Sequence, residues 1–202
     1  MKRAFPVAPL CAAVLLGHSI SASADHDRRK EDDFAARLSG FNEVHFVAGP
    51  PAALRGAIST AAKGSFKAEI DDRKELIHYE LKFEGLEGDV TQAHIHFGQR
   101  STVGGIVIWL CQTAGTPAPA AVAAVTPQCF AEGGDPRAGT VTGIITRAQV
   151  LAQAAQGIEA EAFEEIIAAI RAGATYANVH SALHPPGEIR GHIDPRSGHG
   201  HH

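Results

Sequence analysis

Histidine side chains are concentrated in two short parts of the sequence. His94 and His96 lie two residues apart, and His180, His184 and His192 lie close together near the C-terminal end. Alternate side chains of an extended strand share a face, so His94 and His96 can reach one ion if they belong to a strand. Neutral imidazole binds copper, zinc, iron and nickel. The spacing therefore predicts a metal site that begins with His94 and His96.

His180 is expected to complete this site, because it lies in a second candidate strand. Three imidazoles without a thiolate or methionine ligand favour copper, with zinc or iron as the less favoured ions. His184 and His192 are each a candidate fourth ligand or a residue at the rim of the site. The alternative interpretation is that His94 and His96 are ordinary polar residues of a strand.

Arg190 is the candidate catalytic residue. It stands two positions after Glu188, so the two side chains share a face if this segment is extended. One interpretation is an ion pair that holds the last hairpin together. The other is a cation beside the metal that attracts a small anion such as superoxide.

The first 24 residues have the features of an export signal. Lys2 and Arg3 precede an apolar run at 7–17, and the Ala-Ser-Ala sequence at 22–24 is a typical cleavage site. We therefore expect a cleaved signal peptide at 1–24 and a periplasmic or secreted protein. Without Lys2 and Arg3, 16 basic residues stand against 22 acidic ones, and a net charge of −6 offers no basic surface to nucleic acid. No later segment is apolar for long enough to span a membrane.

Two cysteines remain after the signal, Cys111 and Cys129. In an oxidising compartment, two cysteines separated by an Ala/Pro-rich loop are expected to form a disulfide. The alternative is that they supply thiolate ligands to a metal.

Hydrophobic periodicity predicts one mainly β domain at 34–193. Alternation predicts strands, and an almost continuous apolar run at 104–111 predicts a central strand buried on both faces. The period then changes, and two helices are expected at 147–156 and 159–172. The predicted fold is an antiparallel β-sandwich or barrel with a two-helix insertion near 147–172. A charged lead-in at 25–33 and a disordered, His-rich tail at 194–202 flank it. The expected alternating strands are 34–40, 63–70, 76–84, 92–97, 139–145, 175–181 and 188–193.

Three ordered motifs resemble the CHRD domain, a family named after chordin. They lie at 34–44, at 93–98, and at 176–180 together with 186–191. The resemblance implies a secreted β-rich domain whose function is poorly defined. The chain departs from the family pattern at His45, at His184 and at His192, and these additional imidazoles favour metal binding in this member.

The segment 93–98 is also similar to the strand with which copper-zinc superoxide dismutases hold copper. This local similarity implies, by analogy, superoxide dismutase-like activity at a redox-active copper. If the metal does not change its oxidation state, a copper carrier or buffer is expected instead. A third hypothesis is a non-enzymatic extracellular binding or adhesion module. The sequence does not determine the oligomeric state, and an oligomer is possible.

Overall fold

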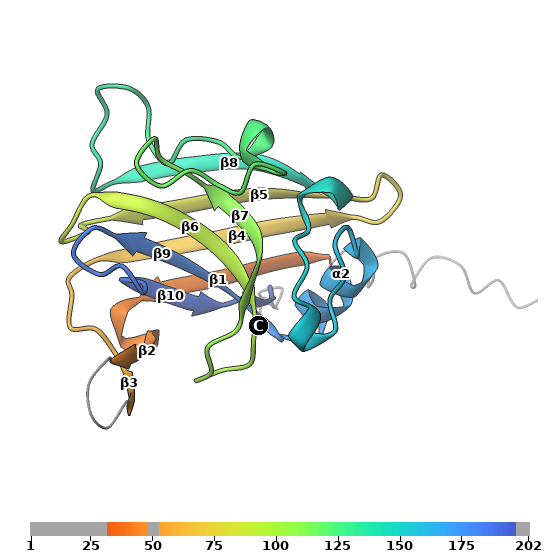
Figure 1. Ribbon diagram of the computed structural model, residues 1–202, viewed down its shortest axis with the longest axis horizontal. Coiled ribbons are helices and arrows are strands. Elements are labelled where there is room, and N and C mark those ends of the chain that lie inside the picture. Colours follow the sequence, from red (N-terminus) through yellow and green to blue (C-terminus); the bar gives the residue numbers. More distant parts are fainter. Residues whose placement is uncertain (1–31, 48–52, 197–202) are drawn as a thin grey trace, which may run out of the picture.

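A single antiparallel sheet forms most of the molecule and curls into a nearly closed barrel (Figure 1). The computed structural model describes residues 32–47 and 53–196. Neighbouring strands follow the order β7-β6-β9-β10-β1-β4-β5-β8, and β11 pairs with β1 beside this path. Their bounds are β1 Asp33–Ser39, β4 Lys63–Asp71, β5 Leu76–Glu84, β6 Val90–Phe97, β7 Gly105–Cys111, β8 Gly139–Thr146, β9 Thr175–Ser181, β10 Ile189–His192 and β11 Asp194–Pro195.

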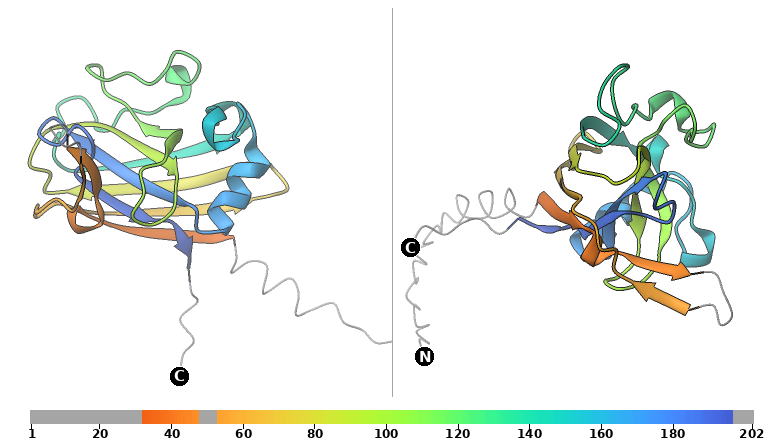
Figure 2. Two further views of the ribbon diagram at one scale, coloured as in Figure 1. Left: turned by 60° about the horizontal axis from the view of Figure 1, so that its bottom comes forward. Right: turned by 90° about the vertical axis from the view of Figure 1, so that its left-hand side faces the viewer.

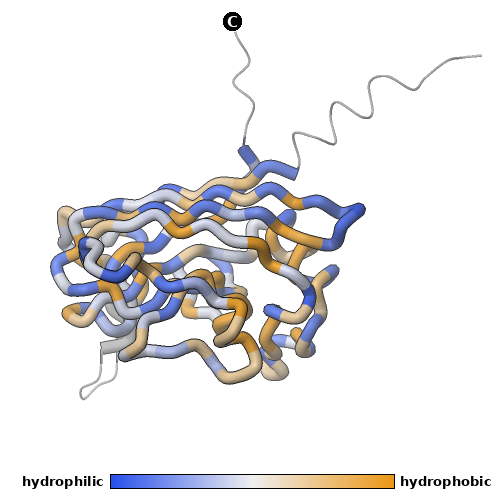
Figure 3. The backbone as a smooth tube through the Cα atoms, turned by 90° about the horizontal axis from the view of Figure 1, so that it is seen from above, coloured by the Kyte–Doolittle hydropathy of each residue, from blue (hydrophilic) through white to orange (hydrophobic). Residues whose placement is uncertain are grey.

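Strict alternation along the strands builds the core. In β5, Ile77, Tyr79, Leu81 and Phe83 are buried while the residues between them are more exposed. Figure 3 shows hydrophilic and hydrophobic residues alternating in this way along neighbouring strands. The hydroxyl of Tyr79 donates to the carbonyl oxygen of Leu110 at 2.7 Å, so the interior of the barrel also ties β5 to β7.

One α-helix, α2 (Phe163–Arg171), lies at one end of the sheet (Figure 2). Its apolar face, which includes Ile166 and Ile170, joins the core of the barrel. Arg171 at its last turn pairs with Asp32 and Asp72, a placement that also suits the negative end of the helix dipole.

The expected two-helix insertion is wrong, because the described chain has one α-helix in this region. The segment at 147–156 instead forms two short 3-10 turns, Arg147–Gln149 and Ala154–Gln156. The predicted capping box of Thr146 is present, but it begins only a single turn. The free edge of β7 explains the difference. The segment that was expected to be helical donates hydrogen bonds to the carbonyl oxygens of Ile106 and Val107 on that edge.

The sequence suggested that β7 is a central strand. It is instead the last strand in the order, at an edge of the sheet. Its residues from Val107 to Cys111 are nevertheless buried on both faces. The 3-10 segment covers its free edge, and the loop that follows Cys111 packs Ala118 and Val122 against Trp109. Cys111 and Cys129 form the expected disulfide, which closes this loop.

Two further segments differ from the prediction made from the sequence. A hairpin of β2 (Val44–Val47) and β3 (Ala53–Gly56), which the pattern did not predict, forms a small separate sheet. Asp194–Pro195, placed in the tail from sequence, instead pairs with β1. The expected signal peptide and residues 197–202 lie outside the described residues. Within the described part of the chain, no helix is long and apolar enough to cross a membrane.

Candidate metal site

Antiparallel pairing places the two histidine-bearing strands side by side. β6 pairs with β9, so that His94 lies opposite Asn178 and His96 lies opposite Tyr176. His180 is two residues further along β9, opposite Gln92. These side chains occupy the sheet face opposite the core residues of the same strands. Pairs that lie opposite or diagonal across two strands are close enough for side-chain contact, and this brings three imidazoles together.

The three rings form a compact cluster. Nδ1 of His94 lies 3.2 Å from Nε2 of His180. One ligand nitrogen from each of His94, His96 and His180 lies within 4.8 Å of the others. Their ring centroids are 4.9 to 6.2 Å apart. The geometry therefore brings three nitrogen donors close together.

Backbone carbonyls fix two of these rings. Nδ1 of His96 is 3.0 Å from the carbonyl oxygen of Gly104, and Nδ1 of His180 is 2.8 Å from that of Pro185. A carbonyl oxygen only accepts hydrogen bonds, so both Nδ1 atoms carry the proton. In a neutral ring the lone pair is then on Nε2, and the Nε2 of His180 faces His94. This is the arrangement in which a histidine is oriented to bind a metal through Nε2.

The cluster is removed from water. His94 is fully buried, and His96 and His180 are 8% and 6% exposed. Trp109 lies edge-on to His94 at 4.3 Å between centroids, and the Tyr176 ring stacks on His96 at 4.7 Å. Burial disfavours the charged ring, so the pKa of His94 falls well below its usual value and that of His96 falls to about 4. Both rings are therefore neutral imidazoles at neutral pH.

Arg190 lies on the same sheet face, and its positive charge acts on His96 of the cluster, whose pKa it helps to lower. Its guanidinium stacks on the ring of Tyr176, 3.6 Å from the centroid. It donates to the carbonyl oxygens of Thr102 and Gln99, at 2.7 and 3.4 Å. These contacts hold the loop between β6 and β7, which also carries the carbonyl that orients His96. Glu188, the other member of the expected ion pair, instead accepts hydrogen bonds from Thr60, Ser181 and the backbone of Glu87.

The structure places His184 and His192 outside the three-histidine cluster. Nε2 of His184 is 3.0 Å from a carboxylate oxygen of Glu87, at the opposite end of β9 from His96. His184, Glu87 and Glu188 form a second group of donor atoms, but the oxygens of Glu188 already accept hydrogen bonds from Thr60 and Ser181. His192 lies across the Tyr176 ring, with 5.8 Å between the ring centroids.

Comparison with known proteins agrees with the motifs. The sequence model of the CHRD domain matches residues 34–193. The chain belongs to the CHRD domain family. Neither a curated protein nor a solved structure matches the chain.

Some residues around the candidate site of this CHRD domain were not found by sequence reasoning. Trp109 and Tyr176 carry the recognisable signal of large aromatic side chains in apolar strands, but only the pairing of β6 with its neighbours brings them to the histidines. Gly104 and Pro185 act through their backbone carbonyl oxygens. Every residue has such an oxygen, so the sequence does not show which of them orient a histidine.

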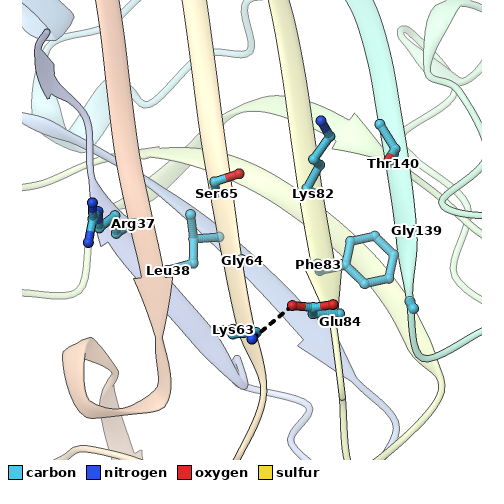
Figure 4. A pocket seen from close by; sticks show the side chains of 11 residues that line it. Arg37, Leu38, Lys63, Gly64, Ser65, Lys82, Phe83, Glu84, Gly139 and Thr140 are labelled. Atoms are coloured by element: carbon cyan, nitrogen blue, oxygen red, sulfur yellow. Dashed lines mark ion pairs between the residues drawn. The ribbon is translucent and has the colours of Figure 1, made fainter.

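A sizeable cavity of the CHRD domain lies elsewhere. It measures about 780 Å³ and is bounded by β1, β4, β5 and β8. Figure 4 shows the ion pair of Lys63 and Glu84 at this cavity, where Nζ and Oε1 are 3.1 Å apart. No histidine lines it. The cavity and the histidine cluster are therefore separate features of the barrel.

Proposed function

We propose that this exported CHRD-domain protein binds one copper ion through His94, His96 and His180. The observation that carries the proposal is the orientation of the rings. Backbone carbonyls hold the Nδ1 atoms of His96 and His180, and Nε2 of His180 is directed at Nδ1 of His94. A histidine whose Nδ1 donates to a carbonyl oxygen is oriented to present Nε2 to a metal.

The spacing of the nitrogens supports a shared ion. Metal–nitrogen bonds are about 2.0–2.1 Å long, so two nitrogens that bind one metal tetrahedrally lie roughly 3.3 Å apart. The distance of 3.2 Å between His94 Nδ1 and His180 Nε2 is close to this value. A proton occupies the position between them in the metal-free neutral pair. Metal binding would replace that proton and shift the His94 tautomer.

Transport or storage of copper is the role best supported by this environment. The ligands are buried, and Arg190 stacks on Tyr176, whose ring in turn stacks on His96. An enzyme that acts on superoxide would need an open path from solvent to the ion. The disulfide is consistent with an oxidising compartment, which supports export to the periplasm or the exterior.

Metal analysis of purified protein tests the proposal. The chain should carry Ala in place of His199, His201 and His202, because a His-rich tail captures metal without a built site. The expected result is one copper per chain, with loss of at least 90% of the bound copper in His94→Ala and in His180→Ala.

The matched control is His184→Ala, which removes an imidazole outside the cluster and should keep full copper occupancy. Equal loss in the control, or no copper in the parent protein, would contradict the proposal. Superoxide consumption by the loaded protein separates an enzyme from a carrier, and we expect none above that of the His180→Ala variant.

A further inference from the structure

The donor set of the cluster carries no charge. Its three members are imidazoles, which bind a metal as neutral rings, and within the described residues neither a carboxylate nor a thiolate joins the group. Cys111 and Cys129 are bound to one another and are not available as thiolates. Whatever charge the ion brings is therefore left uncompensated by its ligands.

The surroundings do not compensate that charge either. The rings of Trp109 and Tyr176 cover His94 and His96. The charged groups on the same sheet face are Arg190, beyond Tyr176, and Glu43, which accepts a hydrogen bond from Asn178. Both are buried, and Glu43 attracts Arg190, but the positive charge of Arg190 still acts on His96, where it lowers the pKa.

Burial penalises a doubly charged ion far more than a singly charged one. The cost of moving an ion from water into a medium of low dielectric constant grows with the square of its charge, so it is about four times larger for a divalent ion. The three-histidine cluster thus favours the ion with the lower charge.

The number of ligands points in the same direction. Cu(II) prefers a tetragonal arrangement and Zn²⁺ almost always takes four ligands. The cluster supplies three nitrogens, and His184 and His192 lie outside it. A water molecule would have to complete a divalent site, but the three rings are at most 8% exposed. Cu(I), with a filled d shell, is stable with three ligands.

We propose that the three-histidine cluster binds Cu(I) in preference to Cu(II) and Zn²⁺. This inference rests on the proposed copper site and specifies its ligand. It makes the protein a carrier of reduced copper, with a copper reduction potential raised above that of the ion in water. The potential rises because the site stabilises the reduced form more than the oxidised form.

Competition titrations of the full chain with Ala at 199, 201 and 202 test the preference. Cu(I) is titrated without oxygen against a chromophoric Cu(I) chelator, and Cu(II) and Zn²⁺ are titrated against chelators of known affinity. The expected dissociation constant for Cu(I) is at least 100-fold lower than that for Cu(II), which raises the potential by about 120 mV at 59 mV per tenfold. Equal or tighter Cu(II) binding overturns the inference, whereas failure of every ion to bind overturns the copper site itself.

A charge variant separates electrostatics from ligand number. Gln92 lies opposite His180 on the cluster face and is partly exposed. Gln92→Glu adds a negative charge there with almost no change in shape, and we expect the ratio of Cu(II) to Cu(I) dissociation constants to fall at least fivefold. The matched control is Gln128→Glu at an exposed residue outside the cluster, which should leave the ratio unchanged. An equal change in both variants, or none in Gln92→Glu, contradicts the charge argument.

Discussion

Single histidines in this protein differ in role because their second ring nitrogens have different partners. In His96 and His180 a backbone carbonyl accepts the Nδ1 proton, whereas His184 contacts a carboxylate of Glu87 near the surface. A ring held by a carbonyl keeps its Nε2 lone pair for a ligand. Residue type alone therefore does not distinguish a candidate ligand from a residue at the rim. The hydrogen-bond partner of the second ring nitrogen distinguishes them.

Burial of His96 should make the metal-free protein sensitive to acid. Its pKa is about 4 in the folded protein against 6.5 for the free ring, so the unfolded chain binds more protons between these values. The contribution of this ring to the free energy of unfolding is fully present above pH 6.5. It falls as the pH decreases toward 4, by up to about 3 kcal/mol. Urea unfolding at several pH values in the presence of a chelator measures the slope.

The variant His96→Phe provides the comparison for this slope. Phenylalanine retains a ring that stacks on Tyr176 but does not titrate. Its stability should decline less between pH 6.5 and 4, and the difference between the two proteins isolates His96 from the carboxylates. Parallel pH profiles would contradict the assigned burial effect.

At the scale of elements, two loops hold the site against the strands. The loop between β6 and β7 is fixed by Arg190 and provides the Gly104 carbonyl. The loop between Cys111 and Cys129 packs on Trp109, which contacts His94. Gln112 anchors this second loop through hydrogen bonds from its amide to the carbonyl oxygens of Ala123 and Thr126.

Removing the disulfide should destabilise the protein and loosen this second loop. The cysteines are 18 residues apart, and cross-linking a loop of that length stabilises a fold by about 3 kcal/mol through the unfolded chain. The double variant Cys111→Ala, Cys129→Ala should lose about this amount in urea unfolding. Emission of Trp109, the single tryptophan, should shift to longer wavelength as Ala118 and Val122 move away. Unchanged stability and emission would mean that side-chain packing alone retains the loop.

At the scale of the whole molecule, the barrel completes the site by joining distant parts of the chain. His94 and His180 are 86 residues apart in sequence, and the segments between them include β7, β8 and α2. An ion that binds all three histidines therefore binds the folded barrel and not the unfolded chain. Copper should act on global stability through this linkage.

Copper should raise the melting temperature of the protein with Ala at 199, 201 and 202. A free ion concentration 100 times the dissociation constant adds about 2.7 kcal/mol, which corresponds to a shift of roughly 5–10 °C for a domain of this size. Calorimetry with and without copper measures the shift. The double variant His94→Ala, His180→Ala should show none. A non-enzymatic adhesion module predicts no copper-dependent shift in either protein, and that result would favour it.

The sequence by itself determined most strands of the main sheet, the disulfide partners and the identity of the three clustered histidines. These features depend on local alternation, on cysteine number and on the two-residue period of a strand, so the neighbouring residues define them. Tertiary structure decided the rest. The free edge of β7 turned an expected helix into 3-10 turns, because its carbonyl groups needed donors. The pairing of β6 with β9 decided which imidazoles meet, because contact between strands depends on sheet order and register, which no single segment encodes.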